Sequence, residues 1–142
     1  MTSDPNTPGT KVAVIGCGHW GKNHVRNFHA LGALAAVADA NPDLAASMSE
    51  TYDVPVKDYA ATLADPAISG VVIAAPAEAH AALAIQALEA GKHVFVEKPL
   101  ALTVAEAEGV LAAAEAVGRI LMVGHLLQYH PAFIKLTEMV RG

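Results

Sequence analysis

The sequence contains a single cysteine, Cys17, in 142 residues. One cysteine excludes an internal disulfide bond and any metal site built from several cysteines. A chain without disulfides fits a reducing compartment, so we expect a cytoplasmic protein. No serine lies in a G-x-S-x-G context, and hydrolase chemistry of that kind therefore has no support.

Basic blocks and long apolar runs are also missing. The formal net charge is −5, which argues against a nucleic-acid or anionic-membrane partner. The longest uncharged stretch, residues 120–134, is too short to span a bilayer and contains Pro131. Residues 1–10 are polar and lack the apolar segment of a secretory signal, so we predict a flexible N-terminal tail.

The remaining residues have the composition of a folded domain. Hydrophobic residues make up 54% of the chain and charged residues 16%, which argues against intrinsic disorder and permits a sizeable core. The length is that of one ordinary domain. We therefore predict one folded domain over residues 11–142.

Short apolar runs alternate with helical patterns along this domain, which is typical of βαβ units that build a parallel sheet. The predicted strands cover residues 11–15, 33–38, 54–56, 70–75, 93–96 and 120–123. The predicted helices cover residues 20–31, 58–63, 78–90, 103–117 and 131–140, with one more beginning at Pro42. Pro55 restricts its strand to an edge of the sheet, and Thr103 with Glu106 has the spacing of a capping box. The sequence thus predicts an α/β fold, a doubly wound parallel sheet of six strands with helices on both faces.

Residues 16–21, GCGHWG, match the dinucleotide-binding pattern G-x-G-x-x-G. Gly16 allows a tight turn after the strand, Gly18 lets the backbone approach a pyrophosphate, and Gly21 lets the next helix pack closely. The helix N-terminus offers free N–H groups to the phosphates. We include His19 and Trp20 among the cofactor contacts of this loop, with packing as the alternative for Trp20. Cys17 lies near the helix N-terminus, which predicts a lowered pKa, but it has no evident partner for a nucleophilic role.

Asp39 ends the second predicted strand, 18 residues after Gly21. A carboxylate at this place accepts hydrogen bonds from the hydroxyls of the adenosine ribose. The alternative is that Asp39 only caps the helix that begins at Pro42. Ala40 and Asn41 offer no arginine for a 2′-phosphate, so the sequence favours NAD over NADP as the cofactor.

Glu97, Lys98 and Pro99 follow the fifth predicted strand directly, downstream of the glycine loop and of a strand ending near Pro76. This combination resembles the Gfo/Idh/MocA family of oxidoreductases, and the resemblance extends over residues 11–142. It implies an NAD-binding Rossmann domain. The stretches GCGHWGKNHVRNFHALG and MVGHLLQYHPAF are similar to the branch that oxidises C3 of UDP-N-acetylglucosaminuronate-type sugars for bacterial surface polysaccharides.

The resemblance also implies roles for individual residues. Lys98 would be the catalytic residue, beside the reacting carbon, where it would orient the substrate hydroxyl and handle its proton. Alcohol oxidation needs such a group in addition to the hydride-accepting cofactor. The resemblance also places Lys98 and Pro99 at a sharp turn that allows a cis peptide bond. The alternative for Lys98 is an exposed charge before a proline turn. Further cofactor contacts are implied at Ala75, Pro76, His80, Glu97, Lys98 and Gln128.

The resemblance also implies a catalytic assembly with a second, substrate-binding domain, which we expect to lie outside residues 1–142. Three functions therefore stay open: an NAD-dependent dehydrogenase of a nucleotide-linked sugar, an NAD-binding module without turnover, and a dehydrogenase of a free polyol or sugar. The expected partner is a small molecule. We also expect a homo-oligomer, because the missing domain leaves an apolar patch around Leu126, Leu127 and Phe133.

The seven histidines do not predict a metal site. His19, His24 and His29 are spaced by five residues, whereas two ligands on one helix face need a spacing of three or four. We place His19 in the phosphate loop and expect His24 and His29 to face solvent or the second domain.

Overall fold

The computed structural model describes residues 9–142, and most of the predicted N-terminal tail lies outside the described residues. The strands are β1 (Val12–Ile15), β2 (Leu34–Ala38), β3 (Gly70–Ile73), β4 (His93–Glu97) and β5 (Leu121–Gly124). The helices are α1 (Gly21–Ala30), α2 (Pro42–Tyr52), α3 (Tyr59–Ala64), α4 (Ala77–Glu89), α5 (Val104–Val117), the 3-10 helix η1 (Leu126–Tyr129) and α6 (Pro131–Arg141).

The five strands form one parallel sheet in the order β2-β1-β3-β4-β5. β2 and β3 lie on opposite sides of β1, so the strand order reverses there, as in doubly wound folds. The predicted parallel α/β fold is confirmed. The predicted strand at residues 54–56 is wrong, because only Val56 forms a single bridge, to Val37. Pro55 has no N–H for a ladder and contributes only its carbonyl, which accepts from the N–H of Val37.

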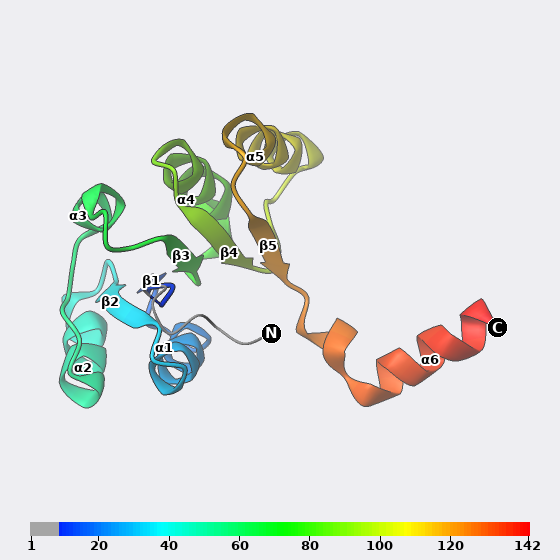
Figure 1. Cartoon of the computed structure of the whole chain (residues 1–142), viewed down its shortest axis with the longest axis horizontal. Helices are drawn as coiled ribbons and strands as arrows, with labels where there is room; N and C mark the ends of the chain where they lie inside the picture. Colours follow the sequence, from blue (N-terminus) through cyan, green and yellow to red (C-terminus); the bar gives the residue numbers. More distant parts are fainter. Residues whose placement is uncertain (1–8) are drawn as a thin grey trace.

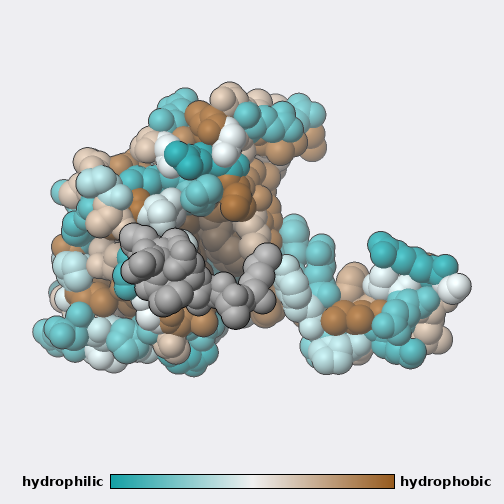
Figure 2. Space-filling view, in the orientation of Figure 1, coloured by the Kyte–Doolittle hydropathy of each residue, from teal (hydrophilic) through white to brown (hydrophobic). Residues whose placement is uncertain are grey.

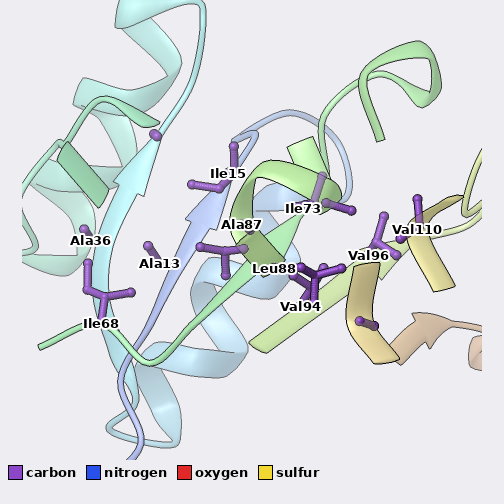
Figure 3. Packing of buried hydrophobic residues seen from close by; sticks show 14 residues of the cluster. Ala13, Ile15, Ala36, Ile68, Ile73, Ala87, Leu88, Val94, Val96 and Val110 are labelled. Carbon is purple, nitrogen blue, oxygen red and sulfur yellow. The ribbon is translucent and has the colours of Figure 1, made fainter. Parts of the chain in front are cut away.

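Helices cover both faces of the sheet (Figure 1), which confirms the second part of the fold prediction. One core cluster joins the strands to α4 and α5, and Figure 3 shows Ala87 and Leu88 of α4 lying over β1, β3 and β4. The other cluster joins the opposite face to α1 and α2 through Val25 and Met48. Val71 and Val72 are both buried, one in each cluster, as expected of a strand covered on both sides.

Local signals set several helix ends. Thr103 and Glu106 form the predicted capping box at the start of α5, with both reciprocal hydrogen bonds present. Pro42 lies in the first turn of α2, and the Asn41 side chain caps that helix by accepting from the N–H of Asp43. These ends position the loops at the edge of the sheet where the strands finish.

The segment formed by η1 and α6 projects away from the rest of the domain (Figure 1). None of its residues is buried. Leu126, Leu127 and Phe133 are exposed to 62%, 71% and 46%, so the apolar patch predicted around them is present. Within residues 9–142, every helix is too short or too polar to cross a membrane. The same residues hold no group of three or more potential metal ligands.

Candidate dinucleotide-binding site

The carboxyl ends of the parallel strands meet at one edge of the sheet. Ile15 at the end of β1 pairs with Ala38 of β2 and with Ile73 of β3. Ile73 in turn pairs with Val96 of β4. The segments that follow these strands, which contain the glycine loop, Asp39 and the turns at residues 74–76 and 97–99, therefore lie along this edge. In open α/β sheets ligands bind outside the carboxyl ends of the strands, where the strand order reverses.

Two glycines of the loop are required by close contacts. Gly16 has φ +97°, and a Cβ there would lie 2.5 Å from the carbonyl oxygen of Ala74. A Cβ on Gly21 would lie 1.7 Å from the carbonyl oxygen of Gly16. The tight turn predicted at Gly16 and the close helix packing predicted at Gly21 are therefore both present.

Gly18 differs from these two because a Cβ there would meet no atom within 4 Å. Around it, the backbone N–H groups of Gly18, His19 and Trp20 have no hydrogen-bond acceptor within residues 9–142. These donors lie at the N-terminus of α1, the positive end of its dipole. Open space beside unpaired N–H groups is what a pyrophosphate requires, so the loop fits the phosphates of a dinucleotide.

Asp39 is fixed beside this loop by two backbone hydrogen bonds. Its Oδ2 accepts from the N–H of Cys17 at 2.6 Å, and its Oδ1 accepts from the N–H of Asn41 at 2.7 Å. The helix cap of α2 is Asn41, so the alternative role of Asp39 as that cap is wrong. Each carboxylate oxygen keeps a lone pair, and two lone pairs suffice for the hydroxyls of a ribose.

The environment of Cys17 corrects the lowered pKa that we predicted. Burial and the negative charge of Asp39 raise the pKa of the Cys17 thiol to about 11. The thiol is 3% exposed and its Sγ faces the carbonyl oxygen of Ala38 at 3.6 Å. The thiol therefore stays protonated and is a poor nucleophile.

Glu97 is the last residue of β4, and the peptide bond between Lys98 and Pro99 is cis. The Oε1 of Glu97 lies 2.6 Å from the Nε2 of His24 on α1, and its Oε2 accepts from the N–H of Lys98 at 3.3 Å. Gly124 on β5 leaves space for the Glu97 side chain, because a Cβ at position 124 would lie 3.1 Å from the same Oε1.

The expected exposure of His24 to solvent is thus wrong, because its side chain is only 15% exposed and bonds Glu97. Its expected contact with a second domain stays a prediction. The spacing could have shown this, since His24 follows the buried Gly21 by three residues and shares its helix face. His29, by contrast, is exposed.

His80 is 2% exposed and lies between two turns at the edge of the sheet. Its Nδ1 lies 2.6 Å from the carbonyl oxygen of Pro99, and its Nε2 lies 2.7 Å from that of Ala75. Both ring nitrogens are therefore used within the chain, and the ring joins the turn after β3 to the turn after β4. A direct contact of His80 with a cofactor stays a prediction.

With this geometry established, comparison with known proteins identifies the family. The family model described as Gfo/Idh/MocA, an oxidoreductase family with an NAD-binding Rossmann fold, matches residues 10–125. The chain belongs to this family. The predicted resemblance, the Rossmann fold and NAD as the cofactor of that fold are thereby confirmed.

Several Gfo/Idh/MocA relatives are similar over most of this chain. UDP-N-acetylglucosamine 3-dehydrogenase of Acidithiobacillus ferrooxidans is 34% identical over 129 residues, which cover 90% of this chain and 41% of the relative. Inositol 2-dehydrogenase of Salmonella typhimurium is 32% identical over 137 residues, which cover 92% of this chain and 41% of the relative. The chain thus spans about 41% of the length of these relatives.

Solved structures show the same similarity. UDP-N-acetylglucosamine 3-dehydrogenase of A. ferrooxidans matches with a TM-score of 0.85 at 32% identity, over 93% of this chain and 43% of that one. A 3-ketoreductase of Actinomadura kijaniata, solved with NADP and TDP-benzene, matches with a TM-score of 0.84 at 31% identity, over 93% of this chain and 43% of that one.

A cavity of about 330 Å³ opens between α1 and the end of the sheet formed by β4 and β5 in this Gfo/Idh/MocA domain. Trp20, His24, Phe95, Glu97 and Tyr129 are among the residues that line it. Figure 2 shows apolar surface on the flank of the domain that faces the projecting segment. Trp20 is 46% exposed, so it is not a core residue. Gln128 lies away from the glycine loop, in a surface cavity that it shares with residues of α6. Its contact with the cofactor stays a prediction.

Proposed function

We propose that this chain is the cofactor-binding part of an oxidoreductase that uses NAD, in preference to NADP, to oxidise a hydroxyl of a sugar. The observation that carries the proposal is the position of Asp39, which hydrogen-bonds the glycine loop at the edge of the sheet where the strand order reverses. A carboxylate there binds ribose hydroxyls and repels a 2′-phosphate.

The proposed cofactor would lie along this edge. Asp39 would bind the adenosine ribose, and the N–H groups of residues 18–20 would bind the pyrophosphate. The turns at residues 75–76 and 97–98 would then hold the nicotinamide end. When bound, NAD supplies the hydride acceptor. Lys98, exposed at this turn, would orient the substrate hydroxyl and take its proton.

For the substrate, we propose the C3 hydroxyl of a UDP-N-acetyl-hexuronate. The similarity to UDP-N-acetylglucosamine 3-dehydrogenase supports this class. The similarity to inositol 2-dehydrogenase favours a free polyol as the second candidate.

A calorimetric titration of the chain with NAD and with NADP tests the cofactor proposal. We expect NAD to bind at least about tenfold more tightly, since one unfavourable charge contact with a 2′-phosphate accounts for a difference of this size. Equal affinity for both, or binding of neither, would contradict the proposed function.

Lys98→Ala is expected to separate binding from chemistry. We expect NADH formation from the sugar to fall by about two to three orders of magnitude, the usual contribution of a general acid or base, while the dissociation constant for NAD changes by less than about threefold. The measurement uses this domain joined to a substrate-binding domain, and the matched control is Lys22→Ala, an exposed lysine on α1. Turnover that survives Lys98→Ala would disprove the catalytic role.

We also propose self-association through the apolar patch on η1 and α6. Sedimentation velocity should show a species larger than the monomer, and Leu127→Lys combined with Phe133→Lys should return it to the monomer, because both side chains are exposed and their replacement costs no core packing. A monomer at every concentration of the unmodified chain would rule this out.

A further inference from the structure

We infer that His80 is a positioning residue that ties together the two turns of the nicotinamide end, beside Lys98; this inference rests on the proposed function. Its two ring nitrogens face two different backbone carbonyls, Pro99 O at 2.6 Å and Ala75 O at 2.7 Å. The first carbonyl belongs to the residue next to Lys98, and the second precedes Pro76. One buried ring therefore joins the ends of two neighbouring strands.

The place of the ring suits this role. His80 is buried, and each of its ring nitrogens lies within hydrogen-bond distance of the carbonyl oxygen of a different turn. A buried carbonyl oxygen that loses its hydrogen-bond partner costs free energy, so each contact favours the observed position of its turn.

The contacts of His80 affect Lys98 because the backbone at Lys98 is held in position through its neighbours, Glu97 and Pro99. Lys98 is exposed, and within residues 9–142 its side chain makes no hydrogen bond. Glu97 on one side is fixed by His24 from α1, and Pro99 on the other side is fixed by His80 from α4. Loss of the His80 bonds frees one side of this turn and separates it from the turn at residues 75–76.

Three substitutions distinguish this role from simple packing. His80→Asn places an amide nitrogen near the former Nδ1 and keeps the bond to Pro99, whereas His80→Gln reaches the position of Nε2 and keeps the bond to Ala75. His80→Phe retains the volume and loses both bonds. We expect NAD affinity to fall about threefold for Asn and for Gln and about tenfold for Phe. His29→Asn, an exposed histidine of α1, is the control. If His80 only fills space, Phe will bind NAD best of the three, and the inference is overturned.

The thermal unfolding midpoint of each variant shows whether it folds. Because the Asn and Gln variants each keep one contact, they test the inference even when the Phe variant fails to fold. Asn and Gln variants that fold and bind NAD like the unmodified chain overturn the inference. Failure of the unmodified chain to bind NAD would instead contradict the proposed function.

Discussion

Gly18→Ala is expected to abolish dinucleotide binding while the chain stays folded, and Gly21→Ala is expected to unfold it. A Cβ at position 18 meets no atom within 4 Å and requires no left-handed φ, so the folded chain accommodates it. The methyl group would, however, occupy the space where the pyrophosphate approaches the N–H groups of the loop. At position 21 the Cβ would lie 1.7 Å from the carbonyl oxygen of Gly16, and no rotation of a side chain relieves that contact.

Urea denaturation and calorimetric titration with NAD measure the two effects separately. We expect the free energy of unfolding to change by less than about 0.5 kcal/mol for Gly18→Ala and to fall by more than about 3 kcal/mol for Gly21→Ala. The control is Gly109→Ala within α5, where a Cβ also meets open space. Because alanine is the better helix former, this control should be stabilised by about 0.5–1 kcal/mol and should bind NAD normally. Unchanged NAD affinity in Gly18→Ala would contradict the phosphate-loop assignment.

The features predicted correctly from the sequence are those set by short-range patterns. The glycine loop, the capping box at Thr103 and the proline at the start of α2 each depend on a few adjacent residues. Apolar runs identified all five strands of the sheet, most clearly β3, in which every residue is buried. The prediction of a strand at residues 54–56 was wrong, because one proline between two valines leaves too few N–H groups for a ladder of hydrogen bonds.

The side-chain contacts of the site were not predictable in the same way. His24 and Glu97 are 73 residues apart in the sequence, and their bond depends on the packing of α1 against β4 and on the space left by Gly124. Lys92 is likewise buried, with its Nζ donating to the carbonyls of Asp65 and Ile68. A lysine is usually exposed, so no local pattern predicts this position. The predicted lowering of the Cys17 pKa was wrong for the same reason. The burial of the thiol and its closeness to Asp39, which raise the pKa, are both set by the tertiary fold.

Asp39→Ala is expected to weaken NAD binding by about ten- to a hundredfold and to reduce the preference over NADP. The substitution removes the proposed acceptor for the ribose hydroxyls, and hydrogen bonds to a charged group contribute about 1.5–3 kcal/mol. It also leaves the N–H groups of Cys17 and Asn41 without their acceptor, so the loop loses its support at the same time. NADP binding should weaken less than NAD binding, because the negative charge that opposes a 2′-phosphate is gone.

Asp39→Asn separates these contributions, and the same titrations with NAD and NADP measure it. Both carboxylate oxygens of Asp39 accept from a backbone N–H, whereas an asparagine side chain accepts only through its single oxygen. One N–H would then face an amide NH₂, so we expect Asn to weaken NAD binding nearly as much as Ala does. Asp43→Ala, an exposed acid in the first turn of α2, is the matched control and should bind NAD like the unmodified chain. If Asp39→Ala and the control give the same affinity and the same preference for NAD, Asp39 does not bind the ribose, and the choice between the two cofactors is made by other residues.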